Sequence, residues 1–204
     1  MTYVLTRHQT RYQSYQEYLD DESLSPERNY RLLSTGELIE VASEDDLNRR
    51  IAFRLLRCLL LSVEEALSEC ICNGNKEIQV QPVGDQRVNR KPDILVLYPE
   101  HLQVARQAVL LGMVPPLFVA EVVSPGGESS DNYQRDYVWK RQQYQWWRIP
   151  EYWIIDPHLA RVTVLVLVGD VYKETVYAGD NLIRSTALPE LAVAAKRLLK
   201  GEML

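Results

Sequence analysis

The sequence predicts an α/β (α+β) fold with a central mixed β-sheet flanked by helices. Apolar residues recur at helical spacing over residues 47–69, and a second helical segment spans 133–147. Short, nearly continuous apolar runs at 93–98, 117–123 and 151–156 are instead typical of buried strands. This order of segments indicates one sheet that buries both of its faces under helices.

The polar start of the chain predicts only small elements. Residues 9–19 are expected to form a short helix, and residues 25–27 a turn or a new helix start. Residues 30–41 are typical of an N-terminal hairpin with its tip at 35–36. Residues 43–46 (Ser-Glu-Asp-Asp) then supply the acidic first turn of the long helix.

The rest of the chain continues the alternation of strands and helices. Its further expected segments are a strand at 77–83, a turn-rich loop at 84–91, an undecided stretch with a short helix at 100–116, a turn at 124–127, a C-terminal hairpin of 161–168 and 171–177, and a final helix at 189–200.

Length and composition predict a single cytoplasmic domain. The chain has 204 residues, of which 46% are hydrophobic and 25% charged. Its three cysteines, Cys58, Cys70 and Cys72, are an odd number without a further Cys or His cluster, so we expect reduced thiols rather than disulfides or zinc ligands. No signal-peptide pattern is present, and no apolar run approaches the roughly 20 residues of a membrane span.

The formal net charge of −5 argues against strong non-specific binding to duplex DNA. It does not exclude a nuclease, because part of the acidity can belong to carboxylates that a bound cation offsets.

Two carboxylates interrupt the apolar strands. Asp93 opens one strand, and Glu121 lies inside the next, between valines and an alanine. An ionised carboxylate within a sheet is costly unless it is paired or bound to a cation. Two such groups on adjacent strands would share one hard divalent ion, and Mg²⁺ (or Mn²⁺) suits oxygen ligands of this kind. Asp93 alone is equally compatible with a strand-opening residue, and Glu121 with an outward edge position.

The helix at 133–147 carries a lysine that can serve such a site. Asp136, Lys140 and Tyr144 are spaced by four residues and therefore share one helical face. A lysine near the metal would orient water and stabilise negative charge in the transition state of phosphodiester hydrolysis. Taken alone, Lys140 is as well explained by a solvated helix position, and Asp136 by an i,i+4 pair with it.

Five strings occur in an order that resembles a known family. They are GELIEV (36–41), KPDILVL (91–97), EVVSPG (121–126), DYVWKRQQY (136–144) and EYWIIDP (151–157). Together they resemble the Uma-type family of restriction endonucleases, common in cyanobacteria and related to the PD-(D/E)XK nuclease superfamily. The resemblance covers about residues 30–160. It implies a restriction-endonuclease-like domain over 1–204 with its core at about 30–180 and a peripheral segment at 1–29.

The resemblance also implies roles for individual residues. Asp93 takes the place of the motif's aspartate and Glu121 that of its second acid, both as catalytic residues and metal ligands. The motif's lysine is replaced by Val123, and Lys140 matches a family lysine supplied from the next helix. Glu40 matches a further acid that would complete the metal shell, although it also suits a surface position. No substrate-binding residue is assigned.

Three functions remain open from the sequence. The first is a Mg²⁺-dependent endonuclease that hydrolyses phosphodiester bonds in DNA. The second is a catalytically inactive binding or interaction protein on a nuclease scaffold, which Val123 and the acidic charge favour. A hydrolase acting on sugars or small molecules through paired carboxylates is the third, although no pattern marks a substrate cleft of that kind. The aromatic residues of 139–153 are interpreted as core, and their density predicts a homodimer.

Overall fold

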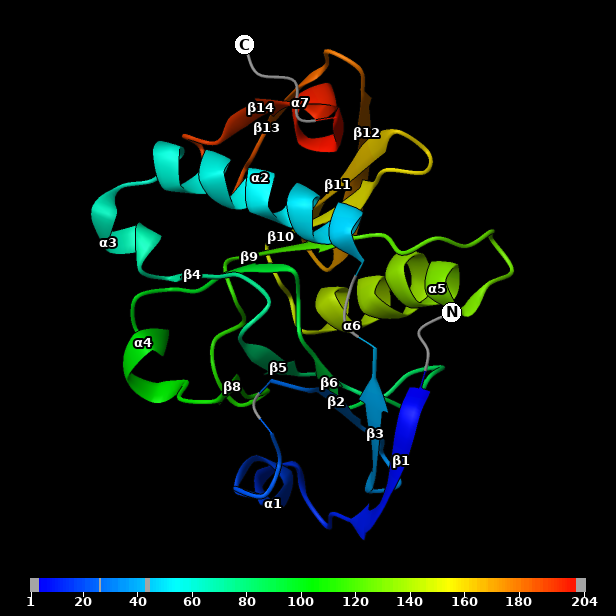
Figure 1. Ribbon diagram of the computed structural model, residues 1–204. Coiled ribbons are helices and arrows are strands. Elements are labelled where there is room, and N and C mark those ends of the chain that lie inside the picture. Colours follow the sequence, from blue (N-terminus) through cyan, green and yellow to red (C-terminus); the bar gives the residue numbers. More distant parts are fainter. Residues whose placement is uncertain (1–3, 26, 43–44, 201–204) are drawn as a thin grey trace.

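The computed structural model describes residues 4–25, 27–42 and 45–200 (Figure 1). Its largest sheet has six strands, in which the central pair β9 and β10 is parallel and the other neighbouring pairs are antiparallel. In spatial order the strands are β12 (Val171–Ala178), β11 (Arg161–Val168), β10 (Glu151–Asp156), β9 (Phe118–Val122), β7 (Ile94–Val96) and β4 (Ile71–Cys72). The mixed α/β prediction is confirmed.

Helices cover both faces of this sheet (Figure 1). The described helices are α1 (Tyr15–Leu19), α2 (Asp46–Ser62), α3 (Glu65–Ser68), α4 (His101–Val104), α5 (Asp131–Tyr133), the π-helix η1 (Gln134–Trp139), α6 (Lys140–Trp146) and α7 (Ala195–Lys200). One face packs against α2 and α7, whose apolar stripe includes Ile51, Leu55 and Leu198. The opposite face packs against α6 through Tyr144.

Three smaller sheets complete the described fold. They are β1 (Val4–Arg11), β3 (Glu37–Val41) and β2 (Asn29–Leu32); β6 (Asn89–Arg90), β5 (Glu77–Gln79) and β8 (Ala108–Val109); and β13 (Leu182–Arg184) with β14 (Ala192–Ala194). The predicted hairpin at 30–41 is β2 and β3, and Gly36 at its tip has φ of +82°. A Cβ at this position would collide with the carbonyl oxygen of Tyr12, so glycine is required there.

The N-terminal helix prediction is wrong in part. Residues 9–11 belong to strand β1, which pairs with β3. Helix α1 begins only after Ser14, whose side chain accepts a hydrogen bond from the backbone N–H of Glu17. Its polar surroundings hid the strand, because the pattern of 4–11 does not alternate strictly between apolar and polar residues.

Two further boundaries differ from the prediction. The long helix α2 ends at Ser62, where Val63 adopts an extended conformation, and does not continue to residue 69. The predicted final helix at 189–200 is helical only from Ala195, because residues 192–194 form strand β14, whose buried Val193 pairs with Ile183 of β13. At the start of α2, Asp45 is the N-cap, while Ser43 and Glu44 lie outside the described residues.

The aromatic residues of 139–153 mostly belong to the core. Tyr144, Tyr152 and Trp153 are fully buried, whereas Trp146 is 58% exposed. The density of aromatics therefore reflects packing between the sheet and its helices, and the homodimer stays a prediction. In the described part of the chain, no helix has the length and apolar character needed to cross a membrane.

Candidate functional site

The strands β7 and β9 bring Asp93 and Glu121 together on one face of the central sheet. Their antiparallel register pairs Ile94 with Ala120, and Asp93 and Glu121 are the next residues in this register, just before β7 begins. Both residues line the same cavity. Side chains that face each other in this way have Cβ atoms about 4.5–5.5 Å apart. Both carboxylates are buried, at 4% and 2% exposure. Two like charges directly opposite each other are destabilising, so the pair requires positive charge nearby.

Lys140 supplies part of this positive charge. It begins α6, and its Nζ lies 3.0 Å from Oε2 of Glu121 and 2.8 Å from Oδ1 of Asp136. The other oxygen of Glu121, Oε1, accepts a hydrogen bond of 2.7 Å from the phenol of Tyr144, one helical turn further along. Asp93 is held separately, because its Oδ2 accepts a 2.6 Å hydrogen bond from the backbone N–H of Val122. Each carboxylate is therefore fixed in orientation.

The π-helix η1 positions the residues that hold Lys140. Asp136 lies within η1 and is completely buried, and Arg135 contacts both of its oxygens, through Nε at 2.8 Å and Nη2 at 2.7 Å. Burial by itself would raise the pKa of Asp136, but Lys140 and Arg135 outweigh it and hold that pKa well below its usual range. Asp136 is thus an anion that anchors the ammonium of Lys140. Single π-turns inside α-helices are frequent at functional sites.

Tyr144 stays a hydrogen-bond donor at this site. Burial, and then the charge of Glu121, raise the pKa of its phenol well above the usual range. A neutral phenol donates to the carboxylate, whereas a phenolate would repel it. The arrangement therefore holds the carboxyl group of Glu121 between a phenol and an ammonium group.

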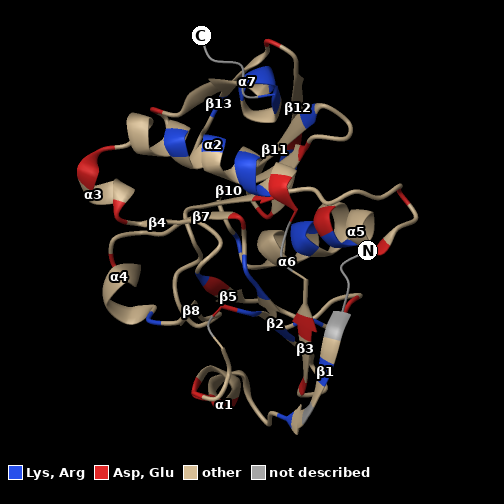
Figure 2. Ribbon diagram, in the orientation of Figure 1, with Lys and Arg blue, Asp and Glu red and all other residues tan. Residues whose placement is uncertain are grey.

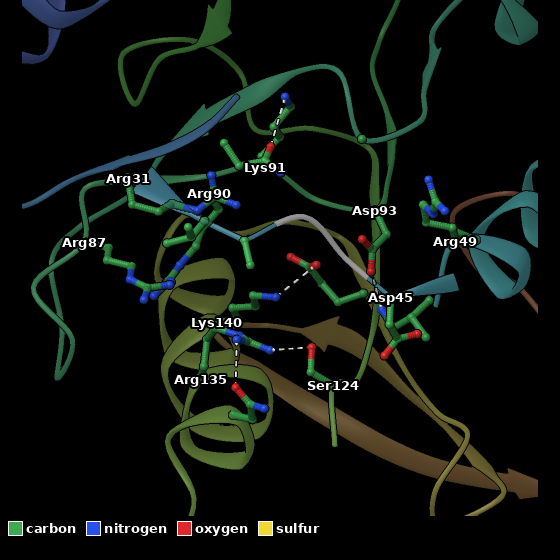
Figure 3. A pocket seen from close by; sticks show the side chains of 18 of the residues that line it. Arg31, Asp45, Arg49, Arg87, Arg90, Lys91, Asp93, Ser124, Arg135 and Lys140 are labelled. Carbon is green, nitrogen blue, oxygen red and sulfur yellow. Dashed lines mark hydrogen bonds and ion pairs between the residues drawn. The ribbon is translucent and has the colours of Figure 1, made fainter. Parts of the chain in front are cut away.

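A cavity of about 620 Å³ opens over these residues, a volume typical of ligand sites. Of the described residues that line it, seven are basic and three acidic: Arg31, Arg49, Arg87, Arg90, Lys91, Arg135, Lys140, Asp45, Asp93 and Glu121. Figure 3 shows Arg31, Arg87 and Arg90 on one side of the view, Asp93 and Asp45 on the other, and Lys140 between them. Acidic and basic segments are otherwise mixed over the ribbon (Figure 2). A chain of net charge −5 thus concentrates positive charge in one cavity.

The structure brings three of the four residues singled out from the sequence to this cavity. Asp93, Glu121 and Lys140 line it, whereas Glu40 is not among the described lining residues. Glu40 lies on β3 and pairs with Arg28, with 3.0 Å between Oε2 and Nη1. We therefore do not include Glu40 in the proposed set of metal ligands.

Sequence reasoning missed the arginines that line the cavity. Arg135 donates to Ser124 at 3.2 Å and to Asn132 at 3.1 Å, and so ties η1 to the loop that follows β9. Its position directly before Asp136 was the one available signal. Arg31 and Arg87 are far apart in the chain, one in the predicted hairpin and the other in the turn-rich loop, so no sequence pattern links them.

Comparisons with known proteins identify the family of this chain. A family model, Uma2, described as "Putative restriction endonuclease", matches residues 13–196. The chain belongs to this family. Uma2 membership confirms the predicted family, and the site residues described above all lie within the matched range. Comparison with curated proteins finds no match.

A solved structure shows the same fold. It is the crystal structure of a "putative nuclease belonging to DUF820" from Anabaena variabilis, which aligns with a TM-score of 0.62 and 15% sequence identity. The alignment covers 90% of this chain and 96% of that one. The likeness therefore extends over nearly the whole chain, and at this identity it shows the fold alone.

Proposed function

We propose that this Uma2 protein is a metal-dependent endonuclease that hydrolyses phosphodiester bonds in DNA. The observation that carries the proposal is the pairing of two buried carboxylates, Asp93 and Glu121, beside the ammonium of Lys140 in a cavity rich in basic residues. Lys140 offsets only part of the negative charge of these two carboxylates, so a metal cation would offset the rest, and the surrounding arginines suit a polyanionic substrate. Family membership supports the nuclease class.

The donor set fits a hard divalent cation. Asp93 and Glu121 offer only oxygen ligands, and each carboxylate oxygen has more than one acceptor position, so the existing hydrogen bonds leave room for an ion. Among the described residues, no group of three His, Cys, Asp or Glu side chains is placed to hold a metal. Two carboxylates match Mg²⁺ or Mn²⁺, which usually bind few protein groups and keep several waters. The bound ion would supply a Lewis acid that polarises a phosphoryl oxygen and lowers the pKa of water.

The chain's own residues prepare the site for substrate. Asp136 holds Lys140 so that its ammonium stays beside Glu121, where it stabilises negative charge that develops on the phosphoryl oxygens. The phenol of Tyr144 holds Oε1 of Glu121 in place, and Glu121 lines the cavity. Because these contacts form before substrate binds, little reorganisation is needed at the moment of reaction.

Cleavage of supercoiled plasmid DNA and of labelled oligonucleotides tests the proposal. The wild-type protein is expected to cleave with Mg²⁺ or Mn²⁺ and to be inactive in EDTA. Asp93→Asn and Glu121→Gln are expected to lose activity by at least about a hundredfold, because each removes a ligand charge with almost no change in shape. Arg11→Gln, a substitution on β1 outside the described cavity lining, is the matched control and should cleave normally.

A second function is favoured by Val123. It occupies the place of the motif's lysine and is buried in the core beneath α6, at 3% exposure. A nuclease scaffold without that lysine would bind nucleic acid or protein without turnover. Lys140 argues for the enzyme, because its ammonium reaches Glu121 from the adjacent helix. Binding of DNA by a pure protein that cleaves under no divalent ion would decide for the inactive alternative.

A further inference from the structure

One wall of the cavity is built from arginines of two neighbouring segments. Arg31 lies on β2, and Arg87 lies just before β6. The segments are joined by a bridge between Leu33 and Arg87 and by a hydrogen bond of 2.9 Å from the backbone N–H of Val88 to the carbonyl of Leu32. The two guanidinium groups therefore come from a rigid part of the fold. Figure 3 shows them on the same side of the cavity.

A third arginine in this wall, Arg90, already has protein partners for its guanidinium group. Arg90 is 1% exposed, and its two terminal nitrogens contact the two oxygens of Asp85 at 2.9 and 3.0 Å. Its Nε donates to Gln143 of α6 at 2.8 Å. This bidentate geometry is the strongest form of an arginine–carboxylate pair. Arg90 is thus a structural link between the wall and α6, and it consumes most of the capacity of Asp85.

The positive charge of the other two arginines is poorly compensated. Arg87 makes a single, longer contact with Asp85, at 3.3 Å from its Nε. Arg31 donates to the carbonyl of Tyr30 at 2.7 Å, and no Asp or Glu within the described ranges forms an ion pair with it. Asp85 is therefore shared by the guanidinium groups of Arg87 and Arg90, and it forms no ion pair with Arg31. Such an excess of partly buried positive charge calls for an anion.

The titration of Arg87 agrees with this charge imbalance. Burial, and then the neighbouring charge of Arg90, lower the pKa of Arg87 to about 9, and Asp85 offsets this only in part. Arginine nevertheless stays protonated in proteins, because its intrinsic pKa lies above 12. The depression therefore reflects the cost of holding an under-neutralised cation in this wall, a cost that a bound anion would remove.

We propose that Arg31 and Arg87 form a phosphate subsite, which holds a backbone phosphate of the nucleic-acid strand next to the one at Asp93 and Glu121. The inference rests on the proposed function and adds a strand-binding surface to it. The planar guanidinium fork matches the geometry of phosphate oxygens. The subsite lines the same cavity as Glu121, so one strand can reach both. A chain of net negative charge would in this way bind DNA through the basic residues of its cavity, without a basic outer surface.

Binding without turnover tests the subsite directly. A short fluorescein-labelled oligonucleotide, single-stranded or duplex, is titrated in EDTA at several salt concentrations and followed by fluorescence anisotropy. Arg31→Gln and Arg87→Gln are each expected to weaken binding about tenfold, as for the loss of a charged hydrogen bond. Each should also lower the slope of log affinity against log salt by about 0.7 for a single strand or 0.9 for a duplex. Arg11→Gln should change neither quantity.

Kinetics under Mg²⁺ supply a second readout. The loss in the two variants is expected to fall on KM rather than on kcat, because the subsite holds the strand and does not touch the reacting phosphate. Arg87→Lys keeps the charge without the planar fork, so its affinity should lie between those of the wild type and Arg87→Gln. Circular dichroism checks folding, and Arg31→Gln, which removes one hydrogen bond to a carbonyl, tests the subsite if Arg87→Gln does not fold.

The outcomes separate the subsite from the proposed function. If the wild-type protein cleaves DNA, and the two variants bind and cleave DNA as well as it does, the subsite alone is overturned. A wild-type protein that neither binds nor cleaves under any divalent ion overturns the proposed function and the subsite with it. An effect of the substitutions confined to 5′-phosphorylated oligonucleotides overturns the backbone assignment in favour of a terminal phosphate.

Discussion

Replacing Lys140 by methionine probes the charge balance of the site. Methionine has a similar length but no charge, so the substitution removes the ammonium group without leaving a large cavity. Lys140 contacts Glu121 at 3.0 Å and Asp136 at 2.8 Å, and all three side chains are buried. After the substitution, Asp136 keeps its pair with Arg135, whereas Glu121 faces Asp93 with only the phenol of Tyr144 as a partner for its side chain among the contacts described above.

The expected loss of stability in Lys140→Met follows from these contacts. Removing one partner of a buried ion pair costs about 3–5 kcal/mol. Because Arg135 still neutralises Asp136, the lower end applies, and we expect a loss of about 3 kcal/mol in the free energy of unfolding. For a chain of this size, each kcal/mol shifts Tm by about 2–4 °C, which gives a fall of about 6–12 °C.

Thermal melting in EDTA measures the fall in Tm of Lys140→Met. Melting with Mg²⁺ tests whether a bound ion compensates for the missing ammonium group. An ion bound between Asp93 and Glu121 should restore up to about 2.7 kcal/mol at a hundredfold excess over its Kd. Lys173→Met on the exposed side of β12 is the matched control and should stay within about 0.5 kcal/mol of the wild type. A Tm for Lys140→Met within about 2 °C of the wild type would refute the reasoning.

Three further substitutions test other parts of the account. Burial and a neighbouring carboxylate raise the pKa of Tyr18 above that of the unfolded chain, so its contribution to stability is complete below a pH of about 10 and is lost as the pH rises further. In urea titrations above pH 10, the unfolding free energy of Tyr18→Phe should therefore decline less steeply than that of the wild type, by up to about 1.4 kcal/mol per pH unit. Glu151 is fully buried and accepts from the backbone N–H groups of 186–187, so Glu151→Gln should cost about 1.5–3 kcal/mol in the same assay, and an unchanged midpoint would contradict this role. In Gly84→Ala the new Cβ would collide with the indole of Trp139 in η1, so we expect a loss of about 1–3 kcal/mol in stability together with slower DNA cleavage.

The acidic residues of the site could be predicted from the sequence because charged side chains rarely occur within apolar strands. A glutamate between apolar residues of a strand, such as Glu121, is visible without any structure, and so is the four-residue spacing of Asp136 and Lys140. Their convergence followed once both carboxylates lay on one face of the same sheet. The expected family and α/β fold could likewise be inferred, because apolar periodicity survives in the buried elements.

Other features leave no local pattern. The π-helix η1 resembles an α-helix in sequence, because one extra residue per turn changes hydrogen bonding and not composition. Arg31 and Arg87 meet through the pairing of β2 with a segment that reads as a turn-rich loop. Strand β14 is short, and its pairing with β13 decides its conformation against a helical composition. Tertiary contacts, rather than propensity, determine all three.

Metal binding tests the central claim most directly. In isothermal titration calorimetry with Mn²⁺ at millimolar concentration, the wild-type protein is expected to bind a single ion per chain, and Asp93→Asn and Glu121→Gln are expected to bind none. Glu40→Gln should bind like the wild type, because Glu40 pairs with Arg28 outside the cavity. Absence of binding heat in the folded wild-type protein, or equal binding by all the variants, would contradict a metal site formed by Asp93 and Glu121.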